Sequence, residues 1–408
     1  MVGGAGRVAR RHRIGRFVGL MLPLALGTWP MASLAQLAVT PHAAVDAEHN
    51  SNVFDLPSSG AAPVGRNGAA FGDTVIGSRA GFDGTYTLGQ QSFFAAGEYR
   101  RFQYNNFTSL SHNEYTAAGG LNWKLDRLME GKLDYLHEQR MVQFMELAAS
   151  QNLILETENR THASANVQIS PEWRLENSLK DRSLDSPRTD IPGLSLREDS
   201  IHEGLRYLGV ANLAAGLDAE YLSGTYRHDP TALNPKYHQI TVGLAGTYVL
   251  SGLTNFNGAI GYTRRSDAAY SGGQSAVTGN LGYKRNLTGK TAIDLEVNRA
   301  INSYLTTGGT EIDTSAAASA TWQATYRATV RLGYAFTSSK FPQSAYGGLG
   351  TRVDHFQTSN AEADYLILHW LTVRAYARYV TRSSTQGLYG FNGTVYGIEF
   401  QAKPERKR

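Results

Sequence analysis

The stretch HQITVGLAGTYVL, residues 238–250, places apolar and polar side chains at alternating positions. One set is almost wholly apolar and comprises His238, Ile240, Val242, Leu244, Gly246, Tyr248 and Leu250. The interleaved set is polar or small and comprises Gln239, Thr241, Gly243, Ala245 and Thr247. Successive side chains of a β-strand point to opposite faces of the sheet, so this spacing predicts a strand with one apolar and one polar face.

Stretches of this kind recur about eighteen times along the chain. We expect strands to begin near residues 38, 73, 91, 113, 130, 157, 173, 199, 213, 237, 253, 275, 291, 311, 325, 353, 371 and 392. The connections between them alternate in length. The long ones span 54–72, 106–112, 141–155, 183–197, 228–236, 267–274, 302–310, 338–351 and 383–391, and the short ones include 170–172, 251–252, 287–290 and 323–324.

Strict alternation of long and short connections is typical of bacterial outer-membrane barrels, which have long external loops and short periplasmic turns. A soluble β-sandwich has no reason to maintain that order along the whole chain. The sequence therefore predicts an all-β fold, a transmembrane antiparallel β-barrel of the bacterial outer membrane with about 18 strands. An even number of strands places both termini in the periplasm.

Aromatic residues on the apolar faces cluster near the strand ends. A row near the short turns comprises Tyr86, Trp123, Trp173, Tyr207, Tyr248, Tyr283 and Trp322. A second row near the long connections comprises Tyr221, Tyr262, Tyr334 and Tyr379. Aromatic rings favour the headgroup level of a bilayer, so the two rows are expected to mark its two interfaces.

The N-terminal segment, residues 1–35, has the features of a Sec signal peptide. It carries five Arg and no acidic residue, then an apolar run over 17–26, then Ser33 and Ala35, which suit cleavage before Gln36. Arg10-Arg11 also allows a twin-arginine signal, and a retained anchor is a further alternative. Of 39 basic residues, 34 remain after these five are removed, against 35 acidic, so the net charge of +4 becomes −1 and no nucleic-acid partner is expected.

We expect the barrel to span 36–400, with Phe400 closing it. The remaining residues, 401–408, are then a charged periplasmic tail. The sequence contains no Cys, which excludes disulfides, thiolate metal sites and a lipoprotein anchor.

The polar faces carry many charges of both signs and are expected to line the lumen. In the predicted register, four Arg flank two acids on three adjacent strands, which gives a local excess of about two positive charges. Two inward tyrosines offer rings that stack on sugars, and the alternative is that all these groups only brace the wall. The pore-lining candidates are Arg327, Arg331, Glu362, Asp364, Arg374, Arg378, Tyr226 and Tyr376.

Catalytic signals are weak. His228-Asp229 and Asp354-His355 lie near predicted long connections, but each is an isolated pair without an orienting partner. We expect no enzymatic activity, no cofactor and no metal site.

Three tracts resemble EpsL-type outer-membrane proteins, β-barrel porins encoded with exopolysaccharide biosynthesis genes. The tract HNSNVFDLP (49–57) is similar to the family's Asp-Asn-Val-Phe-Arg-Leu-Pro pattern, with Ser51 and Asp55 departing from it. YRRFQYNNF (99–107) and NWKL (122–125) are similar to two further strands of the family. The motifs cover residues 45–125, and the rest of the chain agrees in rhythm only.

The resemblance implies a passive export pore or surface-attachment barrel for an extracellular polysaccharide. It implies as partners the polysaccharide, periplasmic polysaccharide-export proteins, outer-membrane lipid and the barrel assembly machinery. The alternative is a general or solute-specific porin, and an outer-membrane enzyme is the least favoured reading.

Overall fold

The computed structural model describes residues 35–57, 71–144, 152–187, 195–227, 236–267, 270–304, 309–341 and 351–404. Within these ranges no helix is long and apolar enough to cross a membrane. The predicted signal peptide lies outside them except for Ala35, which begins the first strand.

The described residues form eighteen strands and two short 3₁₀ helices, η1 (Thr108–Leu110) and η3 (Gly387–Tyr389). The strands are β1 (Ala35–Asn50), β2 (Asp73–Leu88), β3 (Gln91–Tyr104), β4 (His112–Leu125), β5 (Met129–Met141), β6 (Leu155–Ser170), β7 (Trp173–Asp185), β8 (Leu196–Val210), β9 (Leu213–Tyr226), β10 (Lys236–Ser251), β11 (Thr254–Asp267), β12 (Tyr270–Thr288), β13 (Thr291–Tyr304), β14 (Gly309–Trp322), β15 (Ala328–Phe341), β16 (Arg352–Leu368), β17 (Leu371–Ser384) and β18 (Phe391–Ala402).

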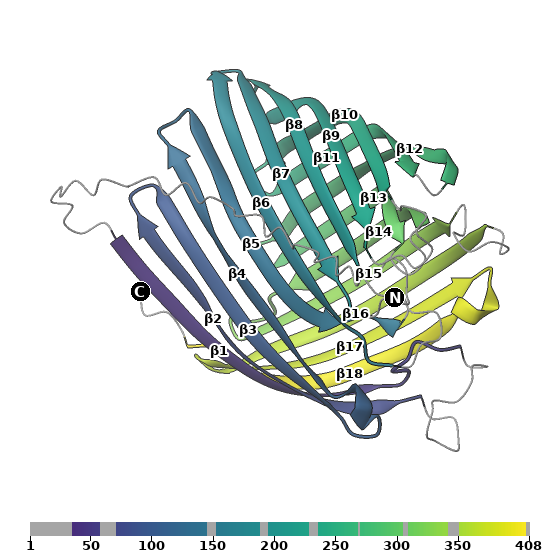
Figure 1. Cartoon of the computed structure of the whole chain (residues 1–408). Coiled ribbons are helices and arrows are strands. Elements are labelled where there is room, and N and C mark those ends of the chain that lie inside the picture. The colour runs from purple at the N-terminus through teal and green to yellow at the C-terminus, as the bar shows by residue number, and fades with distance from the viewer. Residues whose placement is uncertain are drawn as a thin grey trace, which may run out of the picture. The chain divides into compact units, whose positions relative to one another are not determined.

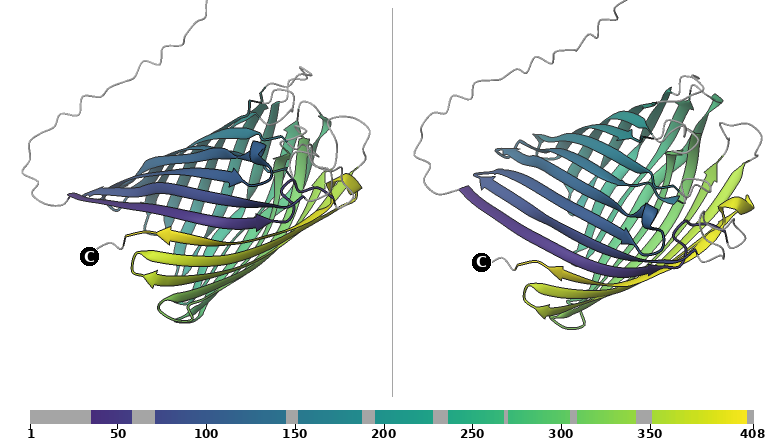
Figure 2. Two further views of the ribbon diagram at one scale, coloured as in Figure 1. Left: turned by 90° about the horizontal axis from the view of Figure 1, so that it is seen from below. Right: turned by 60° about the horizontal axis from the view of Figure 1, so that its bottom comes forward.

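Each strand pairs antiparallel with its neighbours in sequence, and β1 also pairs with β18, from Ala43↔Ala402 to Asn50↔Val395. The purple first strand and the yellow last strand accordingly lie side by side in Figures 1 and 2. The predicted antiparallel barrel with about 18 strands is confirmed, and its sheet has no free edge.

The connections follow the predicted alternation with three exceptions. β11 and β12 are separated by only residues 268–269, and β13 and β14 by 305–308, because both strand pairs continue beyond the expected loop boundaries. Conversely, the connection from β14 to β15 has five residues, 323–327, where two were expected. The other short connections have two or three residues.

The C-terminal strand continues past Phe400, which the sequence predicted as its last residue. Gln401 and Ala402 pair with Ala44 and Ala43 of β1 and with Thr372 and Leu371 of β17. Two further rungs of hydrogen-bonded backbone therefore extend the barrel to 402.

The outer face is apolar. On β10, Ile240, Val242 and Leu244 are 52–57% exposed, while Gln239 and Thr241 turn to the interior. Exposed apolar side chains of this kind recur on strands around the barrel. Such a continuous surface is far larger than soluble monomers expose, and a closed barrel is the sheet architecture that spans hydrocarbon with every backbone group paired. The exterior is the membrane face.

Both predicted aromatic rows lie on this outer face. Exposed rings of the row near the short turns are Tyr86, Trp173, Tyr207, Tyr248 and Trp322, and those of the other row are Tyr221, Tyr262, Tyr334 and Tyr379.

At the long-connection end, the segments that follow β1, β3 and β5 pack together. Phe54 contacts Phe107 and Phe144, at centroid distances of 4.8 and 5.0 Å, within a buried apolar cluster that also holds Leu110 and Ile154. Asn52 orders the first segment. Its Nδ2 donates to the carbonyls of Leu56 and Asn392, and its Oδ1 accepts from the Leu56 amide. The family-like tract at 49–57 thus contributes to a folded cluster near the β1–β18 junction.

Candidate functional site

Four of the predicted lumen residues come together on β15, β16 and β17. Arg331 Nη1 lies 2.6 Å from Asp364 Oδ2 and 3.5 Å from Glu362 Oε2, and Arg374 Nε lies 2.7 Å from Asp364 Oδ1. Period-two alternation and adjacent pairing place all four on the lumen face. Arg331, Glu362 and Arg374 remain 31–40% exposed, so this wall is hydrated.

The cluster continues across the β1–β18 junction. Arg374 Nη1 lies 3.8 Å from Glu399 Oε1, and Arg79 of β2 lies 2.9 Å from the other oxygen of Glu399. Tyr376 donates to Glu48 Oε2 at 3.0 Å. These groups surround a hollow of about 270 Å³ that Asp46 and Arg100 also line.

We call this wall the seam patch. Its charged members are Arg79, Arg100, Arg331, Arg374, Asp46, Glu48, Glu98, Glu362, Asp364 and Glu399. Four cations stand against six acids, a net charge of −2. The seam patch is wider than the predicted cluster, because Glu399, Glu48, Asp46 and Glu98 enter from strands that the prediction did not include.

Two predicted members of the positive cluster are not part of it. Arg327 lies in the turn before β15, not on that strand, and its guanidinium stands 5.1 Å from the Tyr326 ring. Arg378 faces the lumen from β17 but forms no ion pair with any described residue. The first difference arises because the β14–β15 turn is longer than expected.

The two predicted aromatic candidates lie apart. Tyr376 belongs to the seam patch, whereas Tyr226 is at the end of β9, buried against Leu184, Leu196 and Tyr237. No shared stacking surface for a sugar forms between them.

A second charged cluster runs along the opposite wall, across β5 to β8. Arg140 Nη2 lies 2.8 Å from Glu156, and Arg182 Nε lies 2.9 Å from Glu158 Oε1. Arg160 also pairs with Glu158, at 2.5 Å. Arg182 then reaches Glu198 at 3.3 Å. The result is a line of alternating charges from β5 to β8.

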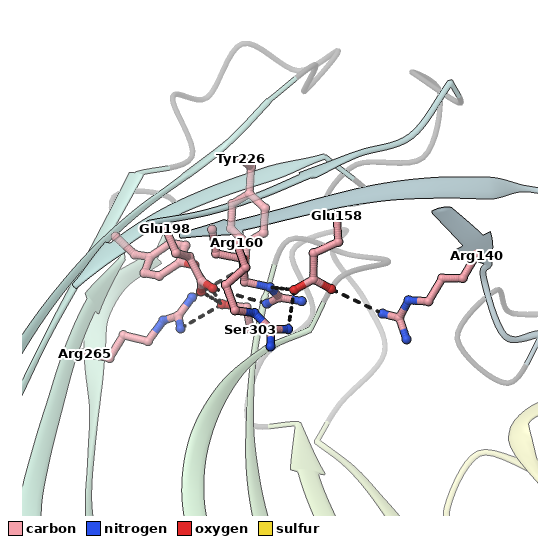
Figure 3. Close-up of polar contacts among 9 residues, drawn as sticks. Arg140, Glu158, Arg160, Glu198, Tyr226, Arg265 and Ser303 are labelled. Atoms are coloured by element: carbon pink, nitrogen blue, oxygen red, sulfur yellow. Dashed lines mark hydrogen bonds and ion pairs between the residues drawn. The ribbon is translucent and has the colours of Figure 1, made fainter. Parts of the chain in front are cut away.

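This line ends on residues from much later strands, as Figure 3 shows. Glu198 accepts hydrogen bonds from the Tyr237 hydroxyl and, at 3.4 Å, from Ser303 of β13. Arg265 of β11 donates to Ser303 at 3.1 Å, and its guanidinium lies 3.6 Å from the Tyr237 ring centroid. Side chains of β8, β10, β11 and β13 therefore meet at one corner of the lumen.

We call the whole set the ladder. It comprises Arg140, Glu156, Glu158, Arg160, Arg182, Glu198, Tyr226, Tyr237, Arg265 and Ser303. Four Arg stand against three Glu, a net charge of +1. The ladder borders a polar hollow of about 600 Å³, into which Gln239, Thr241 and Asn280 also project.

The sequence predicted charges of both signs along the lumen wall but did not identify Glu198, Arg265 and Ser303 as members of one cluster. Pairing of adjacent strands follows from alternation, whereas contact between β8 and β13 depends on how the barrel curves. The sequence alone predicts only which face of its strand each of these residues lies on.

The catalytic candidate that lies within the described residues does not assemble into a site. Asp354 is buried between Arg352 and Arg382, while His355, the next residue, turns to the other face and stacks on Phe336. Adjacent strand residues point apart, so they cannot act as a pair. His228 and Asp229 lie outside the described residues. Among the described residues, no group of His, Asp or Glu has the arrangement of a metal site.

No protein-family model matches the chain, and no curated protein matches its sequence. Among solved structures, it is similar to the outer membrane protein OpdK of Pseudomonas aeruginosa, with TM-score 0.46 and 12% identity over 90% of this chain and 99% of that one. The structure of OccAB3 of Acinetobacter baumannii has TM-score 0.45 and 13% identity, over 90% of this chain and 99% of that one. The siderophore receptor PirA of Pseudomonas aeruginosa has TM-score 0.45 and 11% identity, over 90% of this chain and 80% of that one.

Similarity of this degree carries no argument about function. The fold rests on the chain's own strand pairing and on its apolar exterior. The protein is an 18-stranded outer-membrane β-barrel with a charged, hydrated lumen.

Proposed function

We propose that the protein is a passive channel for small hydrophilic solutes, a porin of general or solute-specific type. The observation that carries the proposal is the state of the lumen charges, which are paired with one another and still exposed to water. Arg182 and Arg331, for example, are 31% and 40% exposed while each contacts two carboxylates. Such a wall replaces part of a solute's hydration without binding it tightly.

The two charged walls suggest which solutes pass. The seam patch has a net charge of −2 and the ladder +1, and in the closed order β18 and β1 lie opposite β9 and β10. Low-dielectric walls focus such fields into the lumen. We expect polar, zwitterionic or sugar-like solutes to be favoured over simple anions, and solutes to move down their concentration gradients.

The orientation belongs to the same proposal. Long connections lie outside and short turns in the periplasm, which places both chain ends on the periplasmic side. An epitope tag within 342–350 is expected to be accessible on intact cells, and one at Gly252 inaccessible. The opposite labelling would reverse the orientation.

The alternative is a conduit or attachment barrel for an exopolysaccharide. It rests on the family-like tracts between residues 45 and 125. The first of these tracts packs in the cluster around Phe54, so its residues serve local folding in the first instance. In this reading the extracellular polymer and periplasmic export proteins are the partners.

Purified barrel in planar bilayers tests the channel proposal. We expect stepwise ohmic conductance and, in liposomes, swelling with small sugars and amino acids. A barrel that assembles but gives no conductance would contradict it. A deletion strain separates the two functions. Unchanged secreted polysaccharide with slower solute uptake supports the porin, and lost polysaccharide with normal uptake supports the alternative.

A further inference from the structure

The membrane face carries an acidic side chain where lipid tails are expected. Glu203 projects outward from β8, between exposed Ile201 and half-buried Leu205. Its register partner Asn177 on β7 faces it, and with the Asn177 amide oriented by that contact its nitrogen donates to Glu203 Oε1 at 3.1 Å. Glu203 forms no ion pair with any described residue. A carboxyl group facing hydrocarbon is unfavourable unless something polar covers it.

The same face carries an arginine five strands away. Arg299 projects outward from β13, where its Nε donates to the Val277 carbonyl at 3.1 Å and its Nη1 to Thr314 Oγ1 at 2.9 Å. These bonds use two of the five N–H groups of the guanidinium. Within the described part of the chain, no carboxylate lies within ion-pair distance of Arg299.

Both charges lie at one depth in the membrane. We call the aromatic row near the short turns the inner row and the row near the long connections the outer row. Glu203 is four residues along β8 from Tyr207 of the inner row. It is two residues from Ile201, which pairs with Tyr221 of the outer row. Arg299 is four residues along β13 from Leu295, which pairs with Tyr283 of the inner row. It pairs with Gly279, one pair below the row that holds Val277 and Tyr262. At about 3.3 Å per residue, each charge lies about 13 Å along its strand from the inner row.

Arg299 stands at the end of an apolar groove of about 570 Å³ on the outer face. Gly246 and Gly258, which pair with each other, and Gly279 form its floor, and Leu244, Ile260 and Leu281 form its sides. The missing side chains keep it open, since a Cβ at Gly258 would lie 3.4 Å from Leu281 Cδ1. Around Glu203 the neighbouring apolar side chains Leu179 and Leu217 are 56–58% exposed.

We infer that this groove receives the β7–β9 face of a second copy of the chain, with Glu203 of one copy paired to Arg299 of the next. One surface is apolar and carries an acid, the other is an apolar groove that ends on a base, and the two charges lie at equal depth. A lipid phosphate could satisfy Arg299 alone, but it leaves Glu203 facing hydrocarbon. A second copy satisfies both.

The contact joins two different surfaces, so it propagates from copy to copy. The two surfaces lie four to five strands apart among eighteen, about 80–100° around the barrel, which suits a closed ring of four copies. All members of such a ring share one membrane orientation.

Cysteine cross-linking tests the contact directly, because the chain contains no native Cys. We expect E203C/R299C, oxidised in native outer membranes, to give a series of covalently linked oligomers. Their yield should be at least tenfold higher than with E203C or R299C alone. The matched control is E203C/L332C, because exposed Leu332 likewise lies two residues below an outer-row aromatic, Tyr334. Equal cross-linking in that control, or none in E203C/R299C, overturns the inference.

Charge exchange provides a second test. Glu203→Arg and Arg299→Glu should each raise the ratio of monomer to oligomer of the purified barrel at least tenfold, as measured by light scattering. E203R/R299E should restore the oligomer. Heat-modifiable migration on gels verifies assembly, and Glu203→Leu and Arg299→Leu replace any variant that fails to assemble. Failure of the double exchange to restore oligomers overturns the inference. So does a monomeric wild type that retains lipopolysaccharide in native mass spectrometry and loses it in Arg299→Leu, since Arg299 is then a lipid site.

Discussion

The seam patch and the ladder are two charged walls of one lumen, built in different ways. In the seam patch, contacts run between adjacent or next-but-one strands, as from Arg331 to Asp364 and from Asp364 to Arg374. In the ladder, Glu198 of β8 contacts Ser303 of β13, five strands away. The seam patch therefore follows the sheet, whereas the ladder braces its curvature. We expect the ladder to contribute more to stability and the seam patch more to selectivity.

The comparison holds only if each strand has one lipid face and one lumen face. Leu244→Arg puts a charge on the lipid face and should cost about 2–4 kcal/mol of unfolding free energy. Thr241→Arg puts the same charge into the polar hollow of the lumen and should cost far less. Urea unfolding of barrels refolded into lipid vesicles measures both. Equal losses would show that the two faces are not distinguished.

Removal of one acid from each wall separates bracing from local pairing. Glu198→Ala should cost about 1–3 kcal/mol, because Arg182, Tyr237 and Ser303 lose a charged partner together. Glu362→Ala should cost about 1 kcal/mol or less, because its Arg331 contact is long and exposed. The same unfolding assay applies, and a larger loss from Glu362→Ala would reverse the assignment.

The link to β13 has a smaller expected effect. Ser303→Ala removes the hydroxyl that joins Glu198, Tyr237 and Arg265, and should cost about 0.5–1.5 kcal/mol. Ser319→Ala, at an exposed lumen position on β14, is the control. If both variants unfold at the same urea concentration as wild type, the cross-strand link contributes nothing.

The smallest effect on stability is expected in the seam patch. Replacing Arg374 of the patch and Arg378, which faces the lumen beyond it on β17, with Gln makes this wall more negative and should change the unfolding free energy by about 1 kcal/mol or less. Reversal potentials in planar bilayers under a salt gradient should shift toward cation preference. Unchanged selectivity would mean that the seam patch does not face the ion path.

The sequence predicted the strands well because both faces of most strands are clearly different in polarity. Seventeen of the eighteen strands begin within three residues of the expected position, and β12 begins at Tyr270 instead of near 275. That strand starts early because Ser275 and Gln274 continue to pair with Arg264 and Arg265 of β11. Its small and polar residues resemble a loop in composition.

The candidate site was predictable only where adjacent register decides it. Arg331, Glu362, Asp364 and Arg374 follow from alternation along neighbouring strands. The predicted position of Arg327 was wrong because the β14–β15 turn is longer than expected, so β15 begins only at Ala328. A few extra residues in a turn leave no periodic signal in the sequence. Glu399 and Arg79 join the seam patch through closure of β1 on β18, and Ser303 joins the ladder through the curvature of the wall. Neither depends on a local pattern.

The pairing of β1 with β18 has a consequence for how the barrel is made. The first strand pairs with its second partner only at the end of the chain, 345 to 359 positions later, from Asn50↔Val395 to Ala43↔Ala402. Until then the growing sheet has two open edges, which template aggregation in water and leave backbone groups unpaired in lipid. Synthesis therefore cannot fold this protein piece by piece into its membrane. The whole chain must reach the membrane unfolded before the barrel closes. Loss of β18 would therefore prevent closure of the barrel and not only remove one strand.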